Sequence, residues 1–197
     1  MIAPLAGKIV GLDSSRAILE KARTNIIGGK IFNIDLVEFV IQPEKDLTFP
    51  FAPETFDIVT FMLAPHDAKE SFRVLKPGGV VLMERPGEMD KRKAKMLFGA
   101  DGGGSRGYLC NETPGSLKTK HQQDFTRAGF GEVETRDGFW NTWYSRDGLI
   151  KVFSEARTVR EFDKEKDKGS IDEVERQFGT TDGIKLSQHR ILLIARK

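Results

Sequence analysis

The residue best placed to do chemistry in this sequence is Asp13, which follows an apolar run near the N-terminus. Residues 9–12 read IVGL, typical of a buried parallel strand, and Ser14 and Ser15 then open a helical stretch. A carboxylate at the carboxyl end of such a strand can accept hydrogen bonds from two hydroxyls, which suits a diol as ligand. The alternative is that Asp13 caps the following helix. Its place at the strand end favours the ligand role.

A literal G-x-G-x-x-G motif occurs later, at Gly102, Gly104 and Gly107. This motif binds dinucleotide phosphates when a strand leads into its turn and a helix follows. Here residues 91–101 do not read as a strand, and residues 108–116 start no convincing helix. We therefore expect a loop rather than a phosphate site.

The histidines and the cysteine give no sign of a metal site or a disulfide. The three histidines, His66, His121 and His189, match no metal-ligand spacing, so we expect no metal. The single cysteine, Cys110, excludes an internal disulfide and suits a reducing compartment, where we expect an inert thiol.

The composition is that of a soluble globular protein of one domain. The chain has 197 residues, of which 39% are hydrophobic and 30% charged, and a net charge of +2. This charge is too small to indicate a nucleic-acid partner. No apolar run approaches the roughly 20 residues of a membrane helix, and no signal peptide is visible. We expect a cytoplasmic protein without membrane or nucleic-acid partners, of unknown oligomeric state.

Strand and helix signals alternate along the chain, which predicts an α/β fold with a mostly parallel sheet. Lys76 to Gly79 read as a type II turn, with Pro at the second position and Gly at the third. We treat residues 1–197 as a single domain with a loop or insertion at 88–117. Strands are predicted at 9–13, 36–41, 56–63, 80–87, 132–145 and 185–197, and helices at 14–25, 67–75, 117–130 and within 146–178.

Four segments in a fixed order carry a resemblance to a known family: KIVGLDSSRAILEKA, DLTFPFAPETFDIVTFM, FRVLKPGGVVLMERP and FTRAGFGEVETRD. They resemble class I S-adenosylmethionine-dependent methyltransferases, particularly the type 11 group that acts on small molecules. The resemblance covers residues 1–87 well and 118–144 loosely. It implies a three-layer sandwich with a Rossmann-like sheet, mostly parallel with an antiparallel C-terminal strand. It also implies S-adenosylmethionine as cofactor and methyl transfer to a small-molecule acceptor.

The resemblance also implies which residues meet the cofactor. Asp13 corresponds to the acidic residue that holds the ribose, and the loop after residue 41 should meet the adenine. Pro43 stands where the family usually has an acid, and Glu44 could substitute for it. The strand end at 62–64 should flank the sulfonium. The implied cofactor-binding residues are Gly11, Asp13, Ser14, Gln42, Pro43, Glu44, Met62, Leu63 and Ala64.

The family's first strand and its D/E-x-G-x-G-x-G loop are missing from this sequence. Backbone N–H groups of that loop normally receive the methionine portion of the cofactor. The missing strand is the centre of the family's sheet, between the strands at 9–13 and 56–63. We therefore expect a compromised sheet centre and an N-terminally truncated version of a longer methyltransferase. An intact seven-stranded sheet built from residues 1–197 would contradict this expectation.

Two alternative functions stay open. The missing loop suits a non-catalytic, methyltransferase-like interaction module, and an acidic residue on the second strand also suits a nucleotide-dependent oxidoreductase.

No catalytic residue is identified, although His66, His121 and Tyr144 are available as bases. Phe139, Trp140, Trp143 and Tyr144 could line an acceptor pocket, but we expect them to be buried against the core or the helices. Residues 146–183 are either a lid-like helical insertion or a solvated helix pair.

Overall fold

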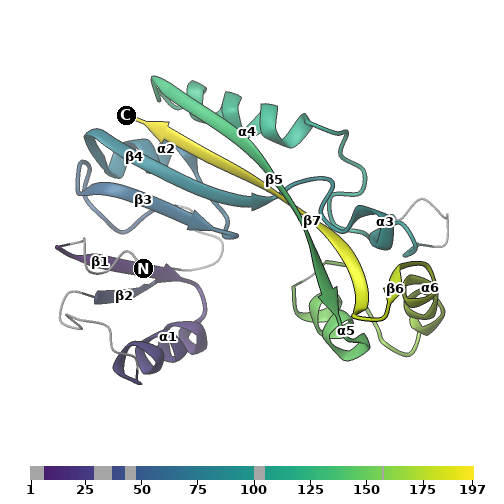
Figure 1. Ribbon diagram of the computed structural model, residues 1–197. Helices are drawn as coiled ribbons and strands as arrows, with labels where there is room; N and C mark the ends of the chain where they lie inside the picture. The colour runs from purple at the N-terminus through teal and green to yellow at the C-terminus, as the bar shows by residue number, and fades with distance from the viewer. Residues whose placement is uncertain (1–6, 29–36, 43–47, 100–104, 157) are drawn as a thin grey trace. The chain divides into compact units, whose positions relative to one another are not determined.

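The computed structural model describes residues 7–28, 37–42, 48–99, 105–156 and 158–197 (Figure 1). The chain divides into two compact units, Met1–Ala52 and Pro53–Lys197, and each is described by itself. That residues 1–197 form a single domain stays a prediction.

The first unit contains a parallel strand pair and one helix. Its elements are β1 (Ile9–Asp13), α1 (Arg16–Gly28) and β2 (Val37–Ile41). The strands pair in register from Ile9 opposite Val37 to Asp13 opposite Ile41. Beyond the strands, the Gln42 N–H donates to the Asp13 carbonyl at 3.1 Å, so the carboxyl ends of β1 and β2 are joined. The strand-then-helix reading of this segment is confirmed.

The second unit is built on a five-stranded mixed sheet. In its main path the strand order is β3-β4-β7-β5, and β6 pairs with β7 (Figure 1). β3 runs parallel to β4, whereas β7 lies antiparallel between β4 and β5. The elements are β3 (Phe56–Met62), α2 (Ala68–Val74), β4 (Leu75–Pro86), α3 (Arg92–Lys95), α4 (Ser116–Arg127), β5 (Glu132–Tyr144), α5 (Arg146–Glu155), α6 (Lys168–Phe178), β6 (Gly179–Thr180) and β7 (Gly183–Arg196).

These pairings confirm an α/β fold with an antiparallel C-terminal strand. The described strands form a two-stranded and a five-stranded sheet rather than one sheet of seven strands. In the larger sheet β3 is an edge strand. The sheet is mixed because β7 enters it in the opposite direction to its two neighbours.

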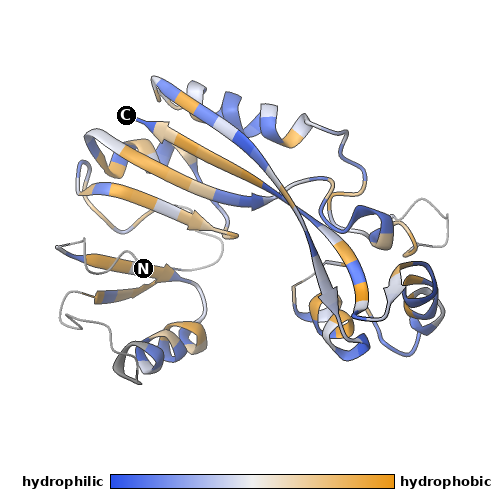
Figure 2. Ribbon diagram, in the orientation of Figure 1, coloured by the Kyte–Doolittle hydropathy of each residue, from blue (hydrophilic) through white to orange (hydrophobic). Residues whose placement is uncertain are grey.

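Alternation along β7 shows which face of the larger sheet is covered. Ile191, Leu193 and Ala195 are buried on the side where α2 and α4 pack, whereas Leu192 and Ile194 are each 44% exposed. Figure 2 shows the corresponding hydrophobic stretches along β4 and β7. The period of two residues is that of a strand whose two faces differ in burial.

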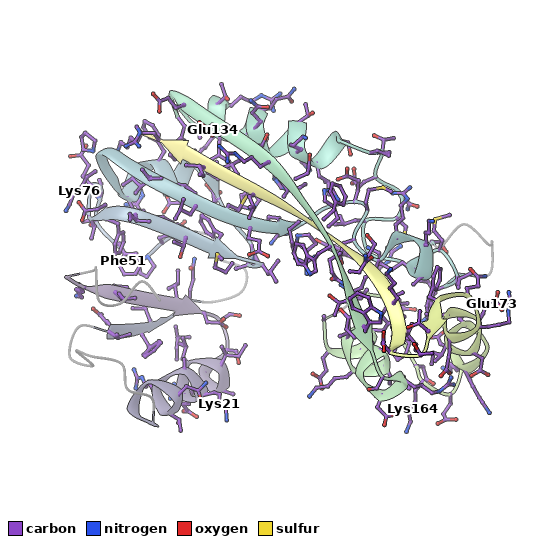
Figure 3. All side chains as sticks on the ribbon, viewed as in Figure 1. Lys21, Phe51, Lys76, Glu134, Lys164 and Glu173 are labelled. Atoms are coloured by element: carbon purple, nitrogen blue, oxygen red, sulfur yellow. The ribbon has the colours of Figure 1, made fainter. Side chains whose placement is uncertain are left out.

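Local sequence chemistry explains where the elements of this unit begin. Asp67 caps α2 by accepting a hydrogen bond from the Glu70 N–H at 2.8 Å. The residues of the predicted type II turn belong to the first part of β4, where Gly78 has the positive φ, +76, that such a turn needs at its third position. Lys76 of this turn lies at the end of the sheet (Figure 3) and pairs with Asp57 at 2.9 Å.

A second hydrophobic core lies at the far end of β5 and β7. We call this region the cap: α3, α5, α6 and the adjoining ends of the two long strands (Figure 1). Charged residues such as Glu173 lie on the outer side of α6 (Figure 3). The buried core of the cap consists of Ala94, Phe98, Leu149, Phe153, Val159, Ile171, Val174, Ile184 and Leu186. The helices predicted within 146–178 therefore pack on a core of their own.

Candidate functional site

Asp13 lies at the carboxyl end of β1, where its predicted role as a ligand stays possible, whereas the cap of α1 is Ser15, whose hydroxyl accepts from the Ile18 N–H at 3.4 Å. The Asp13 Oδ1 accepts a hydrogen bond from the Ser15 N–H at 2.8 Å, at the point where the chain turns into α1. Among the described residues, no partner is found for its second oxygen. The side chain is half-buried. A carboxylate with one oxygen fixed and one available can still accept a hydrogen bond from a ligand hydroxyl.

The other predicted residues of the first unit lie around this carboxylate or outside the described residues. Ser14 is exposed, and Gln42 joins the ends of β1 and β2 through its backbone. Gly11 has a packing reason to be glycine, because a Cβ there would lie 2.8 Å from the Phe39 ring. Pro43 and Glu44 lie outside the described residues, so the predicted adenine contact stays a prediction.

In the second unit, the predicted residues at the end of β3 form an exposed apolar turn. Met62 and Leu63 are 64% and 50% exposed, and Leu63 adopts a left-handed φ of +58. The Leu63 N–H donates to the Glu84 carbonyl at 2.9 Å, and the Ala64 carbonyl accepts from the Arg85 guanidinium. The carboxyl end of β4 therefore fixes this turn.

His66 follows this turn and is held by aromatic rings on three sides. Its ring stacks on Phe125 of α4 with centroids 5.8 Å apart. It also meets His121 and Phe61 edge-on, at 5.1 Å and 6.0 Å. Within the described part of the chain, neither ring nitrogen of His66 has a hydrogen-bond partner. The ring is thus fixed while its nitrogens remain available.

Burial keeps both of these histidines neutral. Desolvation, with smaller contributions from His121 and Arg85, lowers the pKa of His66 from 6.5 to about 4. Desolvation and then Arg85 also lower the pKa of His121. At neutral pH both imidazoles therefore carry a lone pair on one ring nitrogen.

This depressed pKa predicts a pH-dependent stability. Between pH 6.5 and about 4 the unfolded chain takes up a proton at residue 66 that the folded protein excludes. The free energy of unfolding should therefore fall as the pH is lowered through this window. The variant His66→Phe keeps an aromatic ring and should reduce that fall by about 1 kcal/mol.

Urea unfolding at pH 7, 6 and 5 measures this effect. If the stability difference between wild type and His66→Phe is the same at all three pH values, His66 does not titrate as described.

Two polar atoms near these histidines are buried without a hydrogen-bond partner among the described residues: His121 Nδ1 and Glu88 Oε2. Glu88 is 2% exposed, and its other oxygen accepts from the Gly115 N–H at 2.5 Å, at the start of α4. Sequence reasoning did not single out Arg85 or Glu88. They reach His121 only because α4 folds back towards the end of β4, and no local pattern signals that approach.

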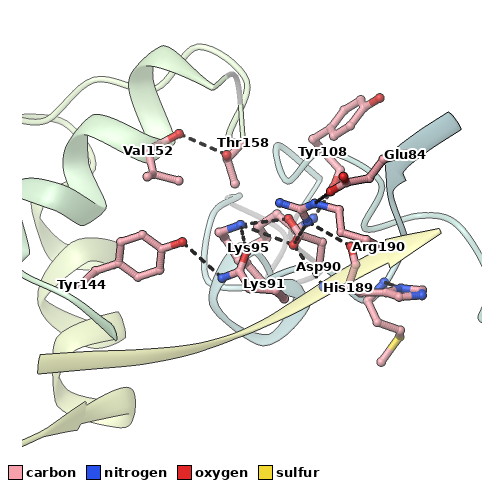
Figure 4. A network of polar contacts seen from close by, with 12 residues as sticks. Glu84, Asp90, Lys91, Lys95, Tyr108, Tyr144, Val152, Thr158, His189 and Arg190 are labelled. Carbon is pink, nitrogen blue, oxygen red and sulfur yellow. Dashed lines mark hydrogen bonds and ion pairs between the residues drawn. The ribbon is translucent and has the colours of Figure 1, made fainter. Parts of the chain in front are cut away.

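A buried ionic network joins the sheet to the cap (Figure 4). The Asp90 carboxylate accepts hydrogen bonds from Arg190 at 2.6 Å and from Lys91 at 3.1 Å. Lys91 also donates to Gln188 at 2.6 Å, and Gln188 in turn donates to the Tyr144 hydroxyl at 3.2 Å. Every member has a partner, so this network reads as structural support rather than a binding site.

The expectation that the aromatic residues of β5 are buried is wrong for three of them. Phe139, Trp140 and Trp143 are 60%, 47% and 45% exposed. Trp140 and Trp143 lie under the cations of Arg190 and Lys185, and Phe139 stacks on His189 at 4.3 Å. β5 is the last strand in the main path of its sheet, so these rings have cross-strand neighbours on one side only, from β7.

No group of three or more His, Cys, Asp or Glu side chains among the described residues is arranged to hold a metal ion. No described helix is long and apolar enough to cross a membrane. A hollow of about 460 Å³ in the cap is lined by none of the predicted site residues. Gly102 and Gly104 of the G-x-G-x-x-G motif lie outside the described residues, and Gly107 forms an isolated bridge with Val159.

The first part of this sequence is similar to a known protein family. Residues 1–83 match the family model described as a methyltransferase domain. No curated protein matches the sequence.

Solved structures resemble the whole chain. A putative methyltransferase from Bacillus halodurans C-125 is 21% identical with a TM-score of 0.65, and the match covers 100% of this chain and 85% of that one. The YcgJ protein from Bacillus subtilis is 20% identical with a TM-score of 0.60 and the same coverage. A Haemonchus contortus phosphoethanolamine N-methyltransferase, bound to phosphomonomethylethanolamine and S-adenosylhomocysteine, is 16% identical with a TM-score of 0.52, covering 100% and 45%.

At these identities the structures establish the fold, and the family model locates the sequence match in the first 83 residues. The resemblance of this chain to the class I S-adenosylmethionine-dependent methyltransferases is thereby confirmed, over residues 1–83 by sequence and over the whole chain by fold.

Proposed function

We propose that this protein transfers a methyl group from S-adenosylmethionine to a small-molecule acceptor. The observation that carries the proposal is Asp13, which ends β1 inside the segment matched by the methyltransferase model and has one carboxylate oxygen without a partner among the described residues. When bound, the cofactor supplies an electrophilic methyl group on a sulfonium.

Each of the two units, taken by itself, has residues that fit one part of this cofactor. Asp13 would accept a ribose hydroxyl, which is the bond that a fixed carboxylate with a free oxygen makes well. Met62 and Leu63 offer apolar surface, and the backbone of Leu63 is anchored to β4. Methyl transfer depends chiefly on alignment of acceptor, methyl and sulfur, so these residues would act by positioning. The small-molecule acceptor is supported by analogy with the Haemonchus enzyme, whose structure contains one.

Asp13→Asn should weaken binding of S-adenosylhomocysteine at least about tenfold, because it removes a charge-assisted hydrogen bond. Isothermal titration calorimetry on the full chain measures this. Glu38→Gln is the matched control, since Glu38 is an exposed carboxylate of β2 that pairs only with Lys8 among the described residues. Equal affinities for Asp13→Asn and wild type would remove Asp13 from the cofactor site.

The same titration separates the second candidate function. No D/E-x-G-x-G-x-G motif occurs in the 197 residues, which favours a non-catalytic, methyltransferase-like interaction module. Wild-type protein that gives neither heat nor a thermal shift with S-adenosylmethionine would support that module. Binding of NADH, detected by fluorescence, would instead support the oxidoreductase alternative.

That this chain is a truncated form of a longer methyltransferase also stays a prediction, as does its cytoplasmic location. Reading the coding sequence upstream of Met1 tests the truncation. An in-frame strand followed by the Gly-rich motif is the expected result, and an in-frame stop codon directly upstream would count against it.

A further inference from the structure

We propose that the second half of β5, residues 138–144, is a docking edge for a second copy of this chain, whose own β5 pairs with it antiparallel. We call these seven residues the aromatic edge. The inference goes beyond the proposed methyl transfer and does not depend on it. An unpaired strand edge, a set of exposed rings and a self-complementary sequence carry it.

The backbone of the aromatic edge has one side without a partner. β5 is the last strand in the main path of its sheet and pairs there with β7 alone. In Figure 1 the aromatic edge is the part of the green strand that leads to α5. The described part of the chain supplies residues 138–144 with no backbone hydrogen bond on the side away from β7. A row of unpaired N–H and C=O groups is a template for another strand.

Charged side chains protect only the first half of β5. The charged residues of this strand are Glu132, Glu134, Arg136 and Asp137. α4 packs along the same half, where Lys118 pairs with Asp137. The aromatic edge reads GFWNTWY and carries no charge. Soluble proteins place charges on exposed strand edges to prevent pairing, so their absence here indicates an edge that pairs.

Three rings of the aromatic edge are exposed and yet held in place. Phe139, Trp140 and Trp143 are between 45% and 60% exposed. Each is fixed by a side chain of β7, through stacking on His189 or a cation over the ring. Ordered rings lose little conformational freedom on binding, so their burial favours association.

The exposed area of these rings indicates how strong the contact is. Together they expose roughly 300–400 Å² in each copy, less than half of the about 800 Å² per partner of a standard interface. We therefore expect a weak dimer that dissociates on dilution.

The order of the residues defines how two copies pair. Successive residues alternate in direction, so two identical antiparallel strands pair only with one residue facing itself across the two-fold axis. Centring the pair on Asn141 sets Phe139 of each copy opposite Trp143 of the other. Aromatic cross-strand pairs of this kind stabilise antiparallel sheets. Centring it one residue earlier would set Trp143 opposite the charged Asp137, and one residue later would leave Phe139 opposite Ser145, beyond the end of β5.

Disulfide cross-linking tests this register. Asn141 is exposed, and the Cα atoms of facing residues in antiparallel strands are about 4.5–5.5 Å apart, which suits a disulfide. Asn141→Cys should therefore form a covalent dimer under mild oxidation. The native Cys110 is only 3% exposed and should not compete. Glu134→Cys is the matched control, because residue 134 is exposed on the same strand but would lie about 45 Å from its counterpart.

Sedimentation velocity of the full chain tests the dimer itself. Over about a hundredfold range of concentration, wild type should change from monomer to dimer, as mass action requires. Trp143→Lys should weaken the dimer at least about tenfold, because it puts a charge on the paired edge and removes a ring from each aromatic pair. Ile194→Lys is the control, since Ile194 is 44% exposed on β7, away from the edge, and it should dimerise as wild type does. Circular dichroism checks that both variants fold.

Each result decides for or against the aromatic edge. Wild type that stays monomeric at every concentration, or a Trp143→Lys variant that dimerises as strongly as wild type, would overturn the inference. Faster cross-linking of Glu134→Cys than of Asn141→Cys would overturn it as well. A monomeric wild type that binds an extended peptide would assign this edge to another partner. None of these results bears on cofactor binding, so the proposed function is tested separately.

Discussion

Gly87→Ala should lower the free energy of unfolding of the Pro53–Lys197 unit by about 3 kcal/mol. A Cβ at this position would lie 2.1 Å from Nδ1 of His189 and 2.2 Å from its Cε1, well inside contact distance. The ring cannot easily move away, because Phe139 stacks on one face and Asp137 holds Nε2. The backbone cannot easily move either, since the Gly87 N–H donates to the His189 carbonyl at 3.0 Å. The strain must therefore appear as lost stability.

Urea unfolding followed by circular dichroism measures this effect. Gly131→Ala is the matched control, because a Cβ at Gly131 meets nothing within 4 Å. The control should stay within about 0.5 kcal/mol of wild type. If Gly87→Ala unfolds at the same urea concentration as the control, the packing of His189 against Gly87 is not as described.

Asp90→Ala should destabilise the same unit by about 3–5 kcal/mol, because it leaves the buried Lys91 ammonium without its counter-charge and weakens the pairing of Arg190. The Asp90 and Lys91 side chains are only 9% and 6% exposed, and Arg190 is 14% exposed. Asp90 also accepts a hydrogen bond from the His189 N–H at 3.2 Å. Removing the carboxylate would therefore leave Lys91 without a counter-charge, leave Arg190 with Glu84 as its remaining carboxylate, and leave a backbone donor unpaired where β7 meets the cap.

The pH dependence of this network has a definite sign. Burial would raise the pKa of Asp90, but Lys91 and Arg190 outweigh it and hold the pKa below the ordinary 3.8. The stabilisation from Asp90 is therefore complete above pH 3.8 and is lost as the pH falls further. Wild type and Asp90→Ala should accordingly converge in stability at low pH.

Asp57→Ala is the control for this prediction, because Asp57 pairs with Lys76 at the surface with 79% of its side chain exposed. It should cost less than about 1 kcal/mol. A similar loss in Asp57→Ala and Asp90→Ala would show that burial of the network adds nothing to its strength.

The secondary structure could be read from the sequence because its signals are local. The apolar run of residues 191–194 predicts β7, and Pro77 with Gly78 predicts the turn that opens β4. Asp67 lies where a helix cap should be, and it caps α2. These features depend on residues within a few positions of each other.

The arrangement in space depended on contacts that no local pattern records. The Met89 N–H finds His189 across 100 positions of sequence, and Lys91 finds Gln188 across 97. The same holds for the candidate site. Asp13 could be predicted from a strand end alone, whereas Arg85, Glu88 and His121 approach one another only through the packing of α4. The cap core, which brings Phe98 to Phe153, could not be inferred from a charged helical segment either.

The position of β7 has a consequence for how the molecule comes to be folded. This strand ends at Arg196, yet it lies between β4 and β5 in the larger sheet. On a ribosome, β3 and β4 can pair early, but β5 must wait for a neighbour that is synthesised after it. Pairing β7 with β4 closes the long stretch of chain between these two strands. Closing it costs conformational entropy and is slow, so the sheet should assemble late. Until then the hydrophobic residues of β4 lack their partner strand β7. A chaperone that covers exposed hydrophobic residues would therefore stay bound to β4 until β7 has been synthesised.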